Sequence, residues 1–141
     1  LYNQAKYRDS SFIFRLLMLL DFTTPKYVLG LAACAHRMQD YTNAANLYFL
    51  CAALDPDNPI PHFHATDCYL ALNALATASY SLQLAIEIAG QQPQYESIKE
   101  RATLMKEAVD KQIEEQAVNE PSEELDEDED EEEEEKSSET A

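Results

Sequence analysis

The chain has 141 residues and a formal net charge of −17, from 27 Asp and Glu against 10 Lys and Arg. So acidic a chain offers no basic surface to a nucleic acid or an anionic membrane, and its longest apolar run is shorter than a membrane span. The three cysteines, an odd number without close pairs, suit a reducing cytosol rather than a disulfide framework.

The N-terminal segment, residues 1–24, resembles part of a helical repeat. Tyr7 is followed by Tyr41, and Phe14 by Tyr48, at one and the same interval. This interval equals the length of a tetratricopeptide repeat, about 34 residues. The chain does not begin with Met and enters directly into a helical pattern, so we expect that a preceding segment is missing.

Two full repeats are expected after this partial one, at 25–58 and 59–92. Pro25, Pro59 and Pro93 form a ladder whose step is the same repeat length. A proline is tolerated in the first turn of a helix, where its missing N–H costs nothing. The ladder therefore marks where successive helix pairs begin.

Each full repeat predicts two helices joined by a short polar turn. Only two glycines occur in the chain, and no segment alternates with the period of two that is typical of a strand, so the expected fold is all-α. The predicted helices are Lys26–Met38, Thr42–Leu54, Ile60–Leu72 and Leu75–Ala89.

Small and large side chains recur at fixed positions in these pairs. Two helices of a hairpin approach closely only where side chains are short, and large side chains fill the space between neighbouring hairpins. The expected small contact residues are Ala32, Ala44 and Ala78, and the expected space-filling residues are Leu31, Tyr48 and Leu82.

A capping helix is expected in the segment 93–118, from Gln94 to about Val118, and completes a domain at 1–118. One face repeats apolar residues at helical spacing, and the opposite face is charged, as in the solvating cap of a repeat array. The residues of the apolar face are Ile98, Ala102, Met105, Val109 and Ile113.

The last segment, 119–141, is predicted to be a disordered acidic tail. Residues 120–135 hold 13 acidic side chains and no basic one. Such a composition cannot bury enough apolar surface to offset chain entropy. Its role is open among a solvating extension, an electrostatic competitor for a basic partner, and a cation binder, although no glycine-punctuated calcium loop is present.

Two segments resemble motifs of a known family. Tyr27–Cys34, with the sequence YVLGLAAC, and Pro61–Leu70, with the sequence PHFHATDCYL, are similar to motifs of class II type III secretion chaperones, the SycD/LcrH-type chaperones of translocator proteins. Residues 1–21 are similar to the first repeat of that family, and the resemblance covers about 1–92. The acidic tail lies outside the general family pattern and resembles that of chlamydial members.

The resemblance implies a cytosolic bacterial chaperone whose tetratricopeptide repeats form a right-handed superhelical array with a concave groove. Family members bind an extended segment of a hydrophobic translocator in this groove and keep the translocator soluble and secretion-competent. Many form homodimers through an N-terminal helix, so a homodimer of this chain would depend on the missing N-terminal segment. A generic tetratricopeptide scaffold and a regulatory factor remain alternatives.

The groove is expected on the first helix of each pair, at fixed positions that point to the concave face. A mixture of apolar and polar residues suits an extended peptide, whose backbone also needs partners. Leu29 and Leu70 could instead belong to the core. The predicted groove residues are Tyr2, Ala5, Lys26, Leu29, Ala33, His36, Ile60, Phe63, Asp67 and Leu70.

No catalytic residue, metal site or cofactor is predicted. His62 and His64 are two residues apart, which does not place them on one side of a helix as a metal pair requires. Cys34 and Cys68 occupy equivalent repeat positions and are expected to be small buried residues. No local motif pairs a nucleophile with a base, and two glycines cannot build a phosphate-binding loop, so the protein is not expected to be an enzyme.

Overall fold

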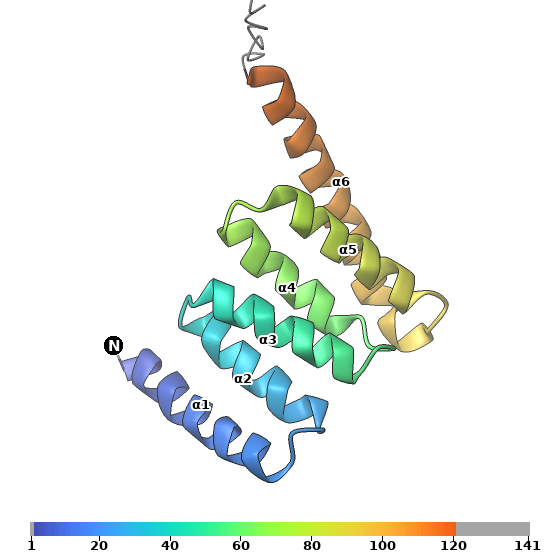
Figure 1. Cartoon of the computed structure of the whole chain (residues 1–141). Coiled ribbons are helices and arrows are strands. Elements are labelled where there is room, and N and C mark those ends of the chain that lie inside the picture. Colours follow the sequence, from blue (N-terminus) through green and yellow to red (C-terminus); the bar gives the residue numbers. More distant parts are fainter. Residues whose placement is uncertain (1, 121–141) are drawn as a thin grey trace, which may run out of the picture.

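The structure is a curved row of α-helices, each packed on the one before it (Figure 1). The computed structural model describes residues 2–120, and only the backbone of Tyr2. No strand occurs in this range, so the all-α prediction is confirmed, whereas most of the predicted tail, 121–141, lies outside the described residues. The elements are α1 (Tyr2–Leu20), α2 (Pro25–Arg37), α3 (Tyr41–Leu54), α4 (Ile60–Ala71), α5 (Leu75–Ala89), the short 3-10 helix η1 (Pro93–Tyr95) and α6 (Glu96–Asn119).

The two predicted helix pairs are α2 with α3 and α4 with α5, and their ends agree with the prediction to within one residue. The capping helix differs slightly, because α6 begins at Glu96 rather than at Gln94. Gln94 lies in η1, where the N–H of Tyr95 bonds to the carbonyl of Gln92 at 3.1 Å, three residues back. This tighter turn precedes the α-helix proper.

The turns within the two helix pairs have the same backbone conformation at positions one repeat length apart. Gln39 has a φ of 62° and Asn73 a φ of 56°, and both stand just beyond a helix end, where a left-handed residue is common. The N–H of Asp40 bonds to the carbonyl of Ala35 at 2.9 Å, and their counterparts in the next repeat, Ala74 and Tyr69, make the same bond at 2.8 Å. The repeat seen in the sequence is therefore also a repeat of backbone geometry.

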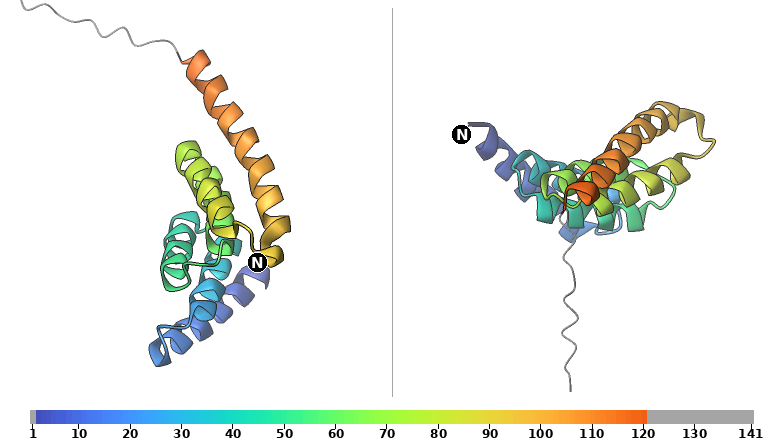
Figure 2. Two further views of the ribbon diagram at one scale, coloured as in Figure 1. Left: turned by 90° about the vertical axis from the view of Figure 1, so that its right-hand side faces the viewer. Right: turned by 90° about the horizontal axis from the view of Figure 1, so that it is seen from above.

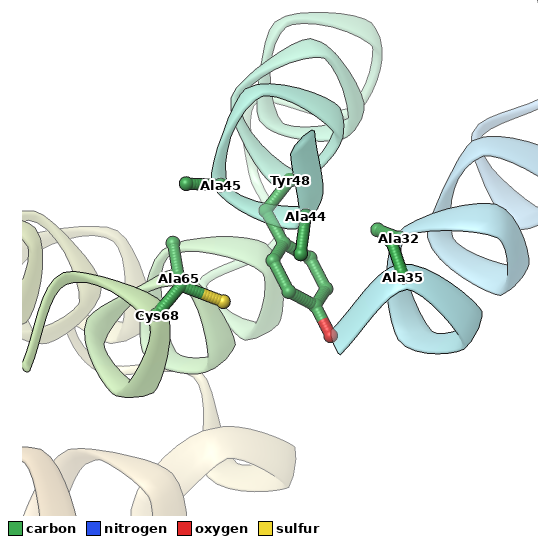
Figure 3. Packing of buried hydrophobic residues seen from close by; sticks show 7 residues of the cluster. All are labelled: Ala32, Ala35, Ala44, Ala45, Tyr48, Ala65 and Cys68. Carbon is green, nitrogen blue, oxygen red and sulfur yellow. The ribbon is translucent and has the colours of Figure 1, made fainter. Parts of the chain in front are cut away.

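The first core cluster lies between α2, α3 and α4, and Tyr48 occupies its centre (Figure 3). The Tyr48 ring extends from α3 between Ala35 of α2 and Cys68 of α4. Alanines around it let the three helices approach closely. The predicted small residues, Ala32, Ala44 and Ala78, and the predicted space-filling residues, Leu31, Tyr48 and Leu82, are all buried.

The second core cluster lies between α4, α5 and α6 and attaches the capping helix. Ala102 and Val109 of α6 are buried in it, and the other residues of the predicted apolar face of α6 pack against it. The Ser79 hydroxyl of α5 also donates a hydrogen bond to Asp110 of α6. The predicted apolar face of this helix is thereby confirmed.

The helices α1 and α6 are the two ends of the row, with the middle helices between them (Figure 1), and the row curves between these ends (Figure 2). α1 exposes many large apolar side chains. None of the helices between residues 2 and 120 is long and apolar enough to cross a membrane. We call the following residues the α1 face: Phe12, Ile13, Leu16, Leu19, Leu20 and Phe22, which are 45–85% exposed.

Candidate peptide-binding groove

A cavity of about 670 Å³ opens between α2 and α4. The first helices of the two pairs form its sides, and two residues of α3 line it between them. We call this cavity the groove. Its lining residues are Leu29, Ala33, His36, Arg37, Gln39, Tyr41, Tyr48, His64 and Asp67.

Four of the predicted groove residues line this cavity together. Leu29, Ala33 and His36 follow one another at intervals of four and three residues on α2, so they share one side of that helix. Asp67 is the counterpart of Ala33, one repeat later on α4. Leu29 also packs against the first core cluster, so its two predicted roles coexist.

Four other predicted residues lie on the same helices outside the cavity. Lys26 is exposed in the first turn of α2, and Ile60 is half-buried at the start of α4. Phe63 is only 6% exposed and belongs to the second core cluster, against which Leu70 also packs. These two apolar residues stabilise the fold at the place where the prediction expected contact with a peptide.

The remaining two predicted residues are at the N-terminal end of α1. The side chain of Tyr2 lies outside the described residues, and Ala5 is exposed. The register explains why Ala5 is remote from the cavity. Because Tyr7 precedes Tyr41 by one repeat length, α1 corresponds to α3, the second helix of a pair, and not to a groove-lining first helix.

Five lining residues were not predicted, because only first helices at strict register positions were considered. Tyr41 and Tyr48 belong to the second helix, and Gln39 to the turn before it. Arg37 and His64 each stand directly beside a register position. The recurrence of aromatic residues one repeat length apart, Tyr7 with Tyr41 and Phe14 with Tyr48, could have indicated these two tyrosines, since Tyr48 is both the centre of the first core cluster and part of the groove.

A histidine and a tyrosine connect the groove to the core. The Tyr48 hydroxyl lies 3.1 Å from Nδ1 of His36. Burial raises the pKa of Tyr48 well above its ordinary value, so this hydroxyl stays protonated and can donate to the ring nitrogen. The His64 ring lies on the other side, 5.8 Å from the Tyr48 ring, and burial lowers the pKa of His64. Near neutral pH the groove therefore presents the neutral imidazole of His64 beside a phenol.

The charged side chains of the groove are unpaired within the described range. Arg37 and Asp67 both line it and are exposed, and between residues 2 and 120 the one ion pair is that of Lys106 with Asp110. A free donor and a free acceptor beside apolar walls suit a peptide, whose N–H and C=O groups both need partners.

The cysteines and histidines form no reactive centre in the described part of the chain. No group of three or more His, Cys, Asp or Glu residues there is arranged to hold a metal ion. Cys34, Cys51 and Cys68 are free and buried, as expected of Cys34 and Cys68. Burial raises the pKa of Cys51 and of Cys68 to about 11, which keeps both thiols protonated and unreactive.

Comparison with known proteins gives close relatives. The chain is 34% identical over 122 residues to the low calcium response locus protein H of Yersinia pseudotuberculosis serotype I (strain IP32953), covering 85% of this chain and 73% of that protein. It is 28% identical over 108 residues to the chaperone protein SicA of Salmonella typhimurium, covering 77% of this chain and 63% of that protein. No model of a protein family matches the chain.

Solved structures agree with these relatives. The translocator chaperone SycD of Yersinia enterocolitica superposes with a TM-score of 0.74 at 34% identity, over 80% of this chain and 78% of that one. PcrH of Pseudomonas aeruginosa, crystallised with the chaperone binding region of PopD, gives a TM-score of 0.74 at 35% identity, over 79% of this chain and 84% of that one. SycD has also been solved with a peptide of the translocator YopD.

Proposed function

Because the chain belongs to the SycD/LcrH-type family of type III secretion translocator chaperones, we propose that its groove binds an extended segment of a hydrophobic translocator. The client is held in the bacterial cytoplasm, soluble and competent for secretion, and no chemical step is involved. The groove supplies recognition of one segment, and the remaining apolar surface of the translocator is kept from aggregating because the complex stays folded and charged.

The observation that carries this proposal is the mixed lining of the cavity between α2 and α4. Leu29 and Ala33 offer an apolar wall, and His36, Arg37 and Asp67 offer hydrogen-bonding groups on the same two helices. Each apolar client side chain buried there contributes about 1.5–3 kcal/mol. The polar groups satisfy the client backbone, which would otherwise lose its bonds to water.

The experiment fills the groove with a bulky side chain. Ala33→Trp places an indole in the cavity from an exposed position, so the fold should tolerate it. The matched control is Ala53→Trp, an exposed alanine of α3 that does not line the cavity. The chain is co-expressed with the hydrophobic translocators of the host's own type III secretion system, and the soluble translocator is measured.

We expect Ala33→Trp to abolish solubilisation, and Ala53→Trp to leave it unchanged. Equal solubilisation by both variants would contradict the proposal that the translocator binds in the groove. Phe63→Ala is unsuitable for this purpose, because Phe63 is buried and its truncation costs about 3–5 kcal/mol of stability.

A generic scaffold that captures a peptide C-terminus is less favoured by the groove. Recognition of a terminal carboxylate requires several converging cations, whereas Arg37 alone among the lining residues of the described chain is basic. Binding of unrelated free C-terminal peptides, with no binding of translocators, would favour that alternative.

We further propose that the α1 face is covered by a second copy of this chain. Its six large apolar residues lie exposed on one helix and the turn after it. A second cavity of about 400 Å³, lined by Arg15, Met18, Leu19, Phe22 and Leu31, lies on the same end of the array. The relative SycD has been crystallised as an alternative dimer.

A further inference from the structure

One side of α6 follows the pattern of the two helix pairs. A shift of one repeat length leads from α2 to α4, and a second shift leads from α4 to α6. Cys34, Cys68 and Ala102 are related by these shifts and are all buried. This side of α6 therefore packs against α5 as the corresponding side of α4 packs against α3.

A second side of α6 departs from the pattern, and it is the side that caps the array. Ala32 is fully buried in the cluster that contains residues of α3, and its counterpart Thr66 on α4 is also fully buried. Their counterpart on α6 is Glu100, which is exposed. Within the described chain no helix follows α6 to cover this side, and the exposed Glu96 and Glu107 also lie on it.

A third side of α6 continues the groove. Ala33 and Asp67 are counterparts that both line the cavity, and the next residue in their row is Arg101, which is exposed like them. One turn further along α6, Leu104 stands one repeat length after Leu70, which packs against the second core cluster, and two after the groove residue His36; unlike Leu70, it is 67% exposed. An extended chain lying across α2 and α4 would reach this side of α6 next.

Arg101 is held in place on this side but is not neutralised. Its Cζ lies over the Phe63 ring, 5.1 Å from the centroid, so the guanidinium is held beside a buried aromatic side chain. A guanidinium has five N–H donors, and such a contact with a ring occupies none of them. No Asp or Glu among residues 2–120 forms an ion pair with it.

The distribution of charge along α6 favours an acidic occupant. No carboxylate stands three or four residues from Arg101 on α6, whereas Glu100 and Glu107 of the capping side stand at these intervals from Leu104. The exposed residues on the Arg101 side are Ser97, Arg101, Leu104, Ala108 and Lys111. A guanidinium that is fixed on a ring binds a carboxylate with two parallel hydrogen bonds, which a flexible lysine cannot do.

We propose that α6 is a third groove-lining helix, on which Arg101 binds an Asp or Glu side chain of the client and Leu104 contacts an apolar side chain beside it. The inference rests on the proposed function, because it extends the same groove by one helix. Packed helices are about 8–10 Å apart and an extended chain advances about 3.3 Å per residue. The acidic client residue should therefore lie about three or four residues from the side chain that enters the cavity.

The test uses the full chain, immobilised, and a phage-displayed library of random 15-residue peptides. Wild type should enrich peptides with apolar residues and one acidic residue at that spacing. Arg101→Gln should enrich the same apolar pattern without the acid, and Arg101→Glu should select Lys or Arg in its place. A synthetic peptide of the wild-type consensus should bind about tenfold more weakly to Arg101→Gln. Arg8→Gln, an exposed arginine of α1, is the control that should change nothing.

Two results would overturn the inference alone. They are a wild-type consensus without an acidic position, and an acidic preference that survives in Arg101→Gln, and both leave the groove between α2 and α4 intact. Failure of the proposed function looks different, because Ala33→Trp would then enrich the same peptides as wild type, and both proposals would be overturned. Thermal unfolding of each variant, followed by circular dichroism, verifies that it is folded.

Discussion

The two ends of the array are each closed by a single helix, and the two helices expose opposite kinds of surface. α6 exposes mostly charged and polar side chains, with Leu104 and Val118 as isolated apolar exceptions. α1 and the turn after it expose six large apolar residues together. Single exposed apolar residues are normal, whereas a contiguous apolar surface marks a site of interaction. The α6 end is therefore suited to water and to a peptide, and the α1 end to another apolar surface.

The two helices also differ in how they are attached. α6 buries Ala102 and Val109, and Asp110 accepts hydrogen bonds from Ser79 of α5 and Lys106 of its own helix. α1 packs on α2 through Phe14, whose half-buried ring rests on Gly30. We infer that α6 is bound firmly to the array and α1 more loosely.

The largest expected effect is a loss of stability when a large side chain that attaches α6 or α1 to the array is truncated. Leu82 is fully buried in the cluster shared by α5 and α6, so Leu82→Ala should lower the free energy of unfolding by about 3–5 kcal/mol. Phe14→Ala at the other end should cost about half as much, because Phe14 is only half-buried. Urea unfolding of both variants measures the difference, and equal losses would contradict the firm and loose attachment.

The second effect concerns self-association through the α1 face. The double variant Leu16→Glu and Leu19→Glu places two carboxylates on that face at exposed positions. We expect the dissociation constant of the dimer to rise at least about tenfold, because burying a charge without a partner is costly. Sedimentation equilibrium measures this constant.

Leu104→Glu is the matched control for self-association, since the 67% exposure of Leu104 lies between that of Leu16, 45%, and that of Leu19, 81%, and Leu104 lies on α6. It should leave the association of two copies unchanged. If the variants of both ends associate like wild type, the α1 face is not where two copies meet.

Most of the fold could be predicted because it depends on local sequence features that recur in each repeat. The ladder of Pro25, Pro59 and Pro93 marks the helix starts, and alanines at repeat positions such as Ala44 and Ala78 mark close helix contacts. These features act over a few residues, so a single sequence displays them. The direct packing of Phe14 on Gly30 was not predicted, because it joins two helices through a side-chain conformation.

The groove could be predicted only in part, because a groove is formed by several elements at once. Ala33 and Asp67 were predicted from register alone, and they line the cavity. Tyr41 was missed because it reaches the cavity from a second helix. Arg101 was missed because α6 was assigned a single role as a cap, whereas its different sides serve different purposes.

A third, smaller effect is expected from Gly30→Ala. A Cβ at this position would lie 2.8 Å from Cε2 of Phe14 and closer still to two other ring atoms, so the ring must move. Overpacking of this kind costs about 1–3 kcal/mol, and alanine regains about 1 kcal/mol of helix propensity, which leaves a net loss of about 1 kcal/mol. Hydrogen exchange should accelerate in α1 and not in α6, and Phe14→Leu in the same chain should restore α1. Uniform acceleration throughout the chain would show that α1 is not a separately attached element.

The smallest expected effect is a pH dependence of the free energy of unfolding, which differs between the centre of the array and its two ends. Burial lowers the pKa of His62 and of His64 in α4. At the ends, hydrogen bonds from Thr24 to Asp21 and from Lys106 to Asp110 lower the pKa of these carboxyl groups.

A histidine with a lowered pKa in the folded state binds its proton more readily when unfolded, so its contribution to stability is complete above about pH 6.5 and is lost as the pH falls toward its folded pKa. The two carboxyl groups contribute above their unfolded pKa, near 4, and lose this contribution only at lower pH. Between pH 7.5 and pH 5 the free energy of unfolding should therefore decrease through the α4 histidines and not through Asp21 and Asp110, and the double variant His62→Gln and His64→Gln should flatten this decrease. A decrease that persists unchanged in the double variant would place the acid-sensitive groups elsewhere in the array.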